Sequence, residues 1–108
     1  MYDVKNKHIL ITGGTGFLGK NIVPLLRQNG ATVTATGRNY DLTSYEKAKE
    51  LFTKDKYDLI IHAAAFQGAA DFPLKYPADQ FNKNNLIHTH ALDCWKEFQP
   101  QARFVGIG

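Results

Sequence analysis

The chain has 108 residues, of which 44% are hydrophobic and 21% charged, and its formal net charge is +3. This composition is that of one ordinary globular domain. The Lys and Arg residues form no basic run, which gives no indication of nucleic-acid or membrane-surface binding. No apolar stretch reaches the roughly 18 residues of a membrane span, and no signal peptide is recognisable. Since the one cysteine, Cys94, has no partner within the chain, we expect a cytoplasmic protein.

The segment from residue 8 to residue 19 (HILITGGTGFLG) joins a short apolar run to three glycines, at positions 13, 16 and 19. Residues 7–12 are typical of a buried parallel strand. A helix is predicted next from the apolar spacing of Phe17, Leu18, Ile22, Leu25 and Leu26, with a stop signal at residues 29–30. Residues 31–36 form a second β-branched run, which completes a strand–helix–strand unit. Pro24 lies inside the helix, where we expect a local distortion.

Three glycines at this spacing suit a dinucleotide-binding turn. The first permits a tight turn, the second a close backbone approach to a pyrophosphate, and the third close packing of helix on strand. The pyrophosphate would meet the positive end of the helix dipole. The residues from Gly14 to Lys20 also match the G-x-x-x-x-G-K phosphate loop of nucleoside triphosphatases, which leaves a second interpretation open. It is disfavoured because Asn21 follows, where such a loop has the Ser or Thr that binds magnesium.

The remaining elements alternate between helix and strand. A helix over residues 45–54, capped by Thr43 or Ser44, precedes a strand at 57–62, a long helix at 77–98 and a last strand at 102–107. The inner stripe of the long helix is predicted to contain Phe81, Asn84 or Asn85, His88, Ala91, Leu92, Trp95 and Phe98. Such alternation predicts an α/β fold, a parallel sheet with helices on both faces. The expected spatial order is a vestigial third strand, then the second, first, fourth and fifth.

Three short motifs follow one another along the chain: Thr12-Gly13-x-x-Gly16-x-x-Gly19, Asp41-Leu42-Thr43 and His62-Ala63-Ala64-Ala65. In this order they resemble the extended short-chain dehydrogenase/reductases, the NAD-dependent epimerase/dehydratase group that acts largely on nucleotide sugars. The stretch Tyr76-Pro77-Ala78-Asp79, with Asn84 seven residues after the proline, resembles the GDP-L-fucose synthase branch. The resemblance implies a Rossmann-type doubly wound parallel sheet, here truncated after the fifth strand.

The resemblance also implies which residues would bind the cofactor. The pyrophosphate would be lined by Gly13, Thr15, Gly16, Phe17 and Leu18. The adenine would be contacted by Asp41 and Leu42, and the ribose nearest the nicotinamide by Ala63, Ala64 and Ala65. The alternatives are an ordinary turn for the Asp-Leu pair and tight packing for the alanines.

Arg38 bears on the choice of cofactor. NAD-preferring members of the family place an acid at the end of the second strand, and residues 35–37 contain none. Arg38 follows directly, and its guanidinium suits a 2′-phosphate, so NADP is favoured over NAD. A solvated loop arginine is the alternative.

Other reactive side chains are not assigned to a site. Tyr45-x-x-x-Lys49 matches the family's acid–base pair but precedes the fourth strand, whereas the family's pair follows the fifth. His88 and His90 diverge on a helix and have no carboxylate partner, so no metal site is predicted. Cys94 is expected to be a buried small hydrophobe, and His62 to close its strand without a visible partner. No catalytic residue is therefore predicted.

The resemblance places the catalytic Ser or Thr just after the fifth strand and the Tyr-x-x-x-Lys pair further on. We therefore expect residues 1–108 to be the N-terminal part of an NAD(P)-binding Rossmann domain, with catalytic and substrate-binding parts absent, and inactive alone. The full-length parent would take a nucleotide-sugar substrate as an epimerase, dehydratase or reductase. An exposed fifth strand would invite self-association. A non-catalytic module that senses dinucleotide or binds a partner is the competing interpretation.

Overall fold

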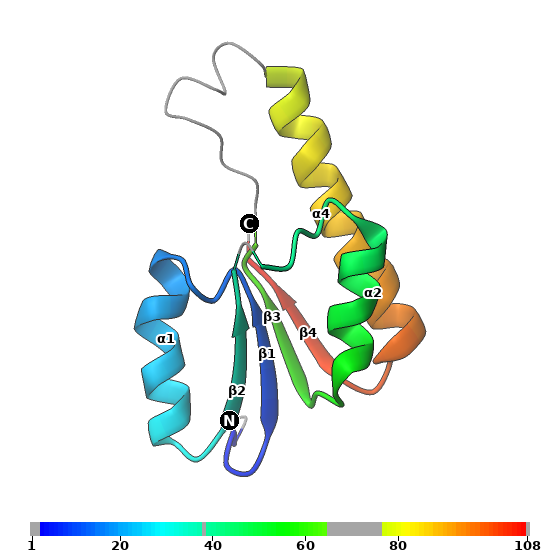
Figure 1. The fold of residues 1–108 in the computed structure, drawn as a ribbon. Coiled ribbons are helices and arrows are strands. Elements are labelled where there is room, and N and C mark those ends of the chain that lie inside the picture. Colours follow the sequence, from blue (N-terminus) through cyan, green and yellow to red (C-terminus); the bar gives the residue numbers. More distant parts are fainter. Residues whose placement is uncertain (1–2, 38, 65–76, 108) are drawn as a thin grey trace.

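The computed structural model describes residues 3–37, 39–64 and 77–107. Its elements in chain order are β1 (His8–Thr12), α1 (Phe17–Gln28), β2 (Thr32–Thr36), α2 (Tyr45–Lys54), β3 (Leu59–His62), α4 (Pro77–Phe98) and β4 (Arg103–Gly106). The strands form one parallel sheet in the order β2-β1-β3-β4. Helix α1 covers one face, and α2 and α4 cover the other (Figure 1). The predicted α/β architecture with a doubly wound parallel sheet is confirmed.

Strand β1 is the centre of the sheet and separates two hydrophobic clusters. Because side chains alternate along a strand, Ile9 and Ile11 point to the α1 side and Leu10 points to the α2–α4 side. The α1-side cluster contains Ile9, Ile11, Val23, Ala31, Val33 and Leu59. The larger cluster contains Leu10, Leu42, Ala48, Leu51, Phe52, Tyr57, Ile60, Ile87, Ala91, Cys94 and Ala102. Apolar side chains therefore cover both faces of the strand that leads into the glycine loop.

The sheet has one strand fewer than the predicted order contains. Residues 39–44 form turns in place of the vestigial third strand, with Tyr40 N–H donating to Gly37 O and Ser44 N–H to Asp41 O. The strand expected as the fifth is β4. Helix α2 begins at the predicted residue, and the backbone amide of Lys47 donates to its Ser44 cap. Helix α1 continues through Pro24 as one helix.

The predicted inner stripe of α4 is partly wrong. Its buried residues are Ile87, Ala91 and Cys94, whereas Phe81 is 65% and Leu92 is 46% exposed. A helix of 22 residues is about 33 Å long, and strands of four or five residues span only about 13–17 Å. The N-terminal half of α4 therefore extends beyond the carboxyl edge of the sheet, where no strand lies beneath it (Figure 1). Trp95 and Phe98 do pack against the larger cluster, as predicted.

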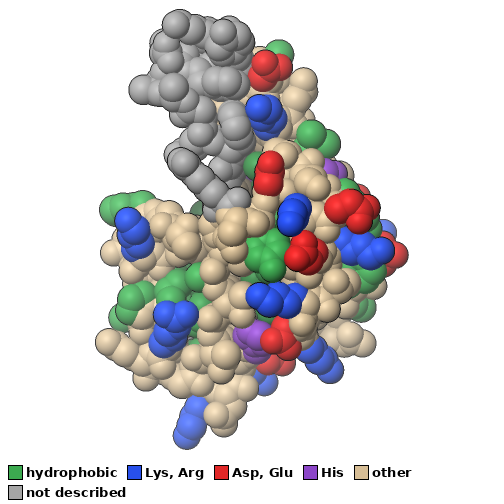
Figure 2. Space-filling view, viewed as in Figure 1, with side chains coloured by type: hydrophobic (Ala, Val, Ile, Leu, Met, Phe, Trp, Pro, Cys, Tyr) green, Lys and Arg blue, Asp and Glu red, His purple; other side chains and the backbone are tan. Residues whose placement is uncertain are grey.

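Charges of both signs are interspersed over the face seen in Figure 2, which fits the thin distribution of charge along the sequence. No single-sign patch is visible on the described part of that face. Among the described residues, none of the helices is both long enough and apolar enough to cross a membrane.

The same substitution at a buried and an exposed phenylalanine tests this arrangement. Phe52 is 0% exposed, and Phe81 is 65% exposed. We expect Phe52→Ala to lower the free energy of unfolding by about 3–5 kcal/mol, because it leaves a cavity in the larger cluster. Phe81→Ala should change it by no more than about 0.5 kcal/mol. Urea unfolding followed by circular dichroism measures both, and similar losses for the two variants would contradict the position of α4.

Candidate functional site

A row of buried polar residues crosses the sheet at the carboxyl ends of its strands. Thr12, Thr36 and His62 are the last residues of β1, β2 and β3, and the register places Thr12 between the other two. All three are at most 4% exposed, and Gln99 is the only other buried polar residue in the described part of the chain. Buried polar groups need hydrogen-bond partners. This row therefore marks the edge at which the sheet is hydrogen-bonded to the loops that follow its strands.

The loop after β1 lies directly against the segment that leaves β3. Gly13 has a φ of +69°, and a Cβ atom there would lie 2.8 Å from both the Cα and the backbone N of Ala64. The Ala63 amide donates to the Thr12 carbonyl oxygen (3.1 Å), and the Ala64 amide donates to the Thr12 hydroxyl (3.2 Å). Any side chain at position 13 would push the two segments apart. The structure thus brings the first glycine and two of the three predicted ribose-lining alanines together, while Ala65 lies outside the described residues.

Helix α1 starts on this loop, with Gly16 as its N-cap. A Cβ atom at Gly19 would overlap the carbonyl group of Gly14, so the third glycine lets the first helical turn pack on the loop. No acidic side chain stands in that turn, and the free amides of a helix start favour anions. The Phe17 side chain is 87% exposed. The groups of Phe17 and Leu18 that could bind an anion are therefore their backbone amides in the first turn of α1.

Thr15 lies on the other side of the loop, against the end of β2. A Cβ atom at Gly37 would overlap the Thr15 hydroxyl oxygen, and the Gly14 amide donates to the Thr36 carbonyl oxygen at 2.8 Å. Position 38 therefore follows a residue that touches the glycine loop. Arg38 itself lies outside the described residues.

The segment that contains Asp41 and Leu42 is held by its own hydrogen bonds. The Asp41 carboxylate accepts from the amide (3.0 Å) and hydroxyl (2.7 Å) of Thr43, and these bonds lower the pKa of Asp41. The Leu42 side chain is 3% exposed within the larger cluster, and its carbonyl oxygen accepts from Nδ1 of His90 at 2.8 Å. Asp41 is exposed and Leu42 is buried as a whole residue, so Asp41 is the member of the pair that a bound adenine could reach in this conformation.

The expectation that His62 has no visible partner is wrong. Its Nδ1 lies 2.6 Å from the Thr12 hydroxyl, and its Nε2 lies 2.9 Å from Nδ1 of His88. Burial, and to a smaller extent the neighbouring His88, lowers the pKa of His62 to about 4. His62 is therefore neutral near pH 7. Sequence reasoning missed this chain of contacts because its members are 50 and 26 residues apart.

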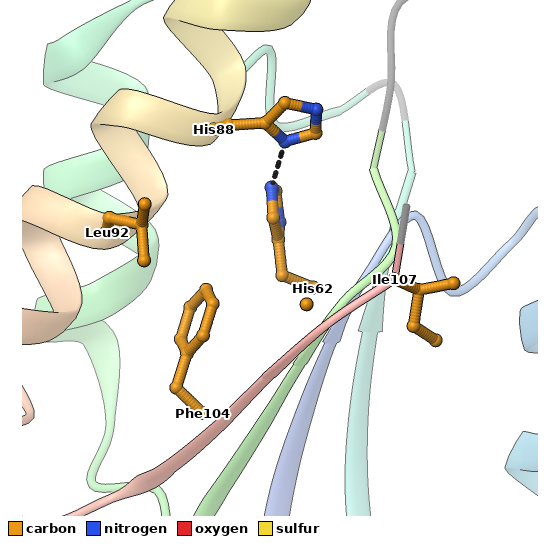
Figure 3. A pocket seen from close by; sticks show the side chains of 6 residues that line it. His62, His88, Leu92, Phe104 and Ile107 are labelled. Carbon is orange, nitrogen blue, oxygen red and sulfur yellow. Dashed lines mark hydrogen bonds between the residues drawn. The ribbon is translucent and has the colours of Figure 1, made fainter.

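An open pocket of about 260 Å³ adjoins this pair of histidines. It lies between α4 and the end of β4 and is lined by His62, His88, Leu92, Phe104, Gly106 and Ile107 (Figure 3). The Phe104 ring lies 5.9 Å from that of His62. Apart from the two imidazoles, the named lining side chains are apolar.

The side chains that were not assigned to a site contact other parts of the fold. Tyr45 packs edge-on against His90, and Lys49 lies over the Phe98 ring, so this pair interacts with α4 and not with the glycine loop. Cys94 is fully buried, and desolvation raises the pKa of its thiol to about 11, which makes it a poor nucleophile. Within the described segments, no group of three His, Cys, Asp or Glu side chains could hold a metal ion.

Asn21 further weakens the phosphate-loop interpretation. Its side-chain amide donates to the Phe17 carbonyl oxygen at 2.8 Å, one turn earlier in α1. The side chain at the position of the magnesium-binding hydroxyl therefore forms a hydrogen bond within α1.

Comparison with known proteins gives one family. The sequence model described as the NAD dependent epimerase/dehydratase family matches residues 9–108. The chain is 44% identical over 63 residues to GDP-6-deoxy-D-talose 4-dehydrogenase of Aggregatibacter actinomycetemcomitans, a match covering 53% of this chain and 20% of that protein. It is 29% identical to a probable GDP-L-fucose synthase of Drosophila melanogaster, over 84% of this chain and 30% of that protein.

Solved structures give the same fold. GDP-mannoheptose C4 reductase from Campylobacter jejuni, with NADP bound, superposes with a TM-score of 0.83 at 22% identity. That match covers 100% of this chain and 34% of the reductase. The chain thus spans about a fifth to a third of the length of these relatives.

The low pKa of His62 makes stability depend on pH. In the unfolded chain His62 binds a proton near pH 6.5, whereas in the folded protein it does so only near pH 4. Stability is therefore lost as the pH falls through this window, by up to about 3 kcal/mol. We expect His62→Asn to remove this part of the pH dependence. Urea unfolding at pH 7 and pH 4.5 measures it, and an equal change in wild type and variant would contradict the assignment.

Proposed function

The chain belongs to the NAD-dependent epimerase/dehydratase family, and from that membership we propose that the carboxyl edge of its sheet binds NADP(H) or NAD(H). The main support is the close approach of Gly13 to Ala64, beside a helix start that packs on the loop at Gly19. A side chain at either glycine would fill space that the turn needs, so these residues fit a dinucleotide-binding turn. When bound, the nicotinamide would accept or donate a hydride.

Within this proposal the residues divide by the part of the cofactor they would meet. The pyrophosphate would be bound by Gly13, Thr15, Gly16, Phe17 and Leu18, with the amides of the α1 start directed at its charge. The adenine would lie beside Asp41 and Leu42. The ribose nearest the nicotinamide would pass Ala63, Ala64 and Ala65, where small side chains leave room.

We propose NADP as the preferred cofactor, with Arg38 binding its 2′-phosphate. Support comes from the end of β2, where residues 35–37 include no acid and Arg38 follows directly. The nearest carboxylate beyond it, that of Asp41, is engaged by Thr43. A guanidinium can form two parallel hydrogen bonds to a phosphate. An acidic side chain at the same position would repel the phosphate.

For the whole protein we propose an epimerase, dehydratase or reductase acting on a nucleotide sugar in the cytoplasm. The names of the relatives support this substrate class, and the buried, unpaired Cys94 fits a reducing compartment. Residues 1–108 alone are expected not to transfer hydride, because Tyr45 and Lys49 pack against α4. A non-catalytic dinucleotide-sensing or interaction module would bind cofactor in the same way. Searching the protein that contains this chain for a Ser and a Tyr-x-x-x-Lys pair after β4 separates the two.

Titration of the chain with NADPH, NADH and magnesium ATP tests the cofactor proposal. We expect NADPH to bind at least about tenfold more tightly than NADH, the value of roughly one charge-assisted hydrogen bond. Arg38→Ala should remove this preference. Arg103→Ala, which removes the same charge at the amino end of β4, should retain it. Tighter, magnesium-dependent ATP binding would overturn the proposal, and an unchanged preference in Arg38→Ala would remove Arg38 from the site.

We also propose that the 108-residue chain self-associates through β4. This strand is an edge of the described sheet, and Val105 and Ile107 are 43% and 42% exposed. Exposed apolar edges pair readily, and a lysine at the edge opposes pairing. We expect sedimentation equilibrium to show a dimer that Val105→Lys makes monomeric and Leu25→Lys, on α1, does not. A monomeric wild type would contradict this.

A further inference from the structure

One turn of α4 reaches two separate parts of the candidate site. His88 contacts His62 at the end of β3, and His90 contacts the backbone at Leu42. We propose that this turn of α4, through His88 and His90, positions both halves of the cofactor site. His88 would act on the nicotinamide side and His90 on the adenine side. The inference rests on the proposed dinucleotide binding and adds two positioning residues to it.

The His88 branch follows from where the hydrogens must lie. The Thr12 hydroxyl oxygen accepts from the Ala64 amide, and its own hydrogen needs an acceptor because Thr12 is fully buried. Nδ1 of His62, at 2.6 Å, is that acceptor. A neutral His62 then carries its hydrogen on Nε2 and donates it to Nδ1 of His88 at 2.9 Å (Figure 3). Only in this arrangement do the Thr12 hydroxyl hydrogen and the His62 ring hydrogen both have an acceptor among these contacts.

This chain of hydrogen bonds ends at the cofactor-facing backbone. Its first member, the Ala64 amide, belongs to the residue that lies against Gly13. Without the acceptor at His88, the Nε2–H of the nearly buried His62 loses its hydrogen-bond partner. Rotation of the imidazole away from Thr12, toward another acceptor, then becomes more favourable. The Thr12 hydroxyl would then lose the bond that orients it toward Ala64. His88 thus acts on the segment 63–64 without touching a ligand itself.

The His90 branch holds the opposite side. A carbonyl oxygen can only accept, so Nδ1 of His90 carries a hydrogen and donates it to Leu42 O at 2.8 Å. The other face of this contact is closed by Tyr45, whose ring lies 5.7 Å from that of His90. The Leu42 side chain is meanwhile anchored in the larger cluster. The backbone of this segment is thus fixed from α4, which sets where an adenine could lie.

The divergence of the two histidines is what makes both branches possible. Residues two apart on a helix point about 200° apart around its axis, which excludes a shared metal ion but allows contacts on two sides. Thr89 stands between them and is exposed. It provides a matched control on the same turn.

The test separates the two branches by comparing the complete cofactor with a fragment that contains only its adenine half. Binding of NADPH and of adenosine 2′,5′-bisphosphate is measured for His88→Leu, His90→Leu and Thr89→Ala. We expect His90→Leu to weaken both ligands about fivefold to tenfold, the effect of roughly one hydrogen bond. His88→Leu should weaken NADPH by a similar factor and leave the adenine fragment within about twofold. Thr89→Ala should match the wild type.

Conservative variants distinguish positioning from simple loss of packing. Asparagine places an oxygen or an NH₂ group near the Nδ1 position of histidine, so His88→Asn and His90→Asn should restore wild-type binding. Glutamine places these groups near Nε2, so His88→Gln should not, which keeps the test valid where a leucine variant fails to fold. Equal binding by the Asn and Gln variants, or wild-type binding by both Leu variants, would overturn the inference and leave the proposed function intact.

A readout without cofactor completes the design. Long-range ¹H–¹⁵N spectra of the histidines at pH 7 should show His62 in the Nε2–H form in the wild type and in His88→Asn. The Nδ1–H form in the wild type would overturn the His88 branch. A wild-type chain that binds neither NADPH nor adenosine 2′,5′-bisphosphate would instead overturn the proposed function, and the inference with it.

Discussion

The structure of the candidate site depends on the hydrogen bonds of one buried residue, Thr12. Its carbonyl oxygen accepts from the Ala63 amide, and its hydroxyl joins the Ala64 amide to the His62 ring. The following residue, Gly13, then approaches Ala64 so closely that a Cβ atom would not fit. Thr12 thus holds the strand that enters the glycine loop to the strand on its other side. The position of the loop is determined by β3 as much as by β1.

The order of the strands makes this edge the natural place for a ligand. The chain passes from β1 to β2 on one side and then crosses to β3 and β4 on the other, so the connections that follow β1 and β3 lead to strands on opposite sides. A crevice forms at such a switch point in doubly wound sheets. At Gly13 and Gly19 a Cβ atom would not fit, so the glycine loop can pack this closely on Ala64 and on the first turn of α1.

Local patterns in the sequence predicted the elements well because each carries its own signal. Pro77 at a first turn and the apolar periodicity that follows predicted α4 from start to end. Its inner face could not be predicted, since that depends on how far the helix extends past short strands, and Phe81 was misplaced for this reason. The glycine spacing predicted the turn. The partner of His62 could not be found, because contact with His88 depends on how α4 is rotated against the sheet.

The distribution of buried polar residues favours a role in positioning over one in stability. Along β1 and β3, the interior positions Leu10 and Ile60 are apolar, and the buried polar residues are the last ones, Thr12 and His62. A buried polar network contributes little net stability compared with apolar packing, and it imposes geometry only when every member is satisfied. If stability were the need, an apolar residue at position 62 would serve as well. A neutral imidazole between a hydroxyl and a second imidazole instead fixes the orientation of these hydrogen-bonded groups. It does so at the carboxyl edge of the sheet, where the loops must hold a defined shape.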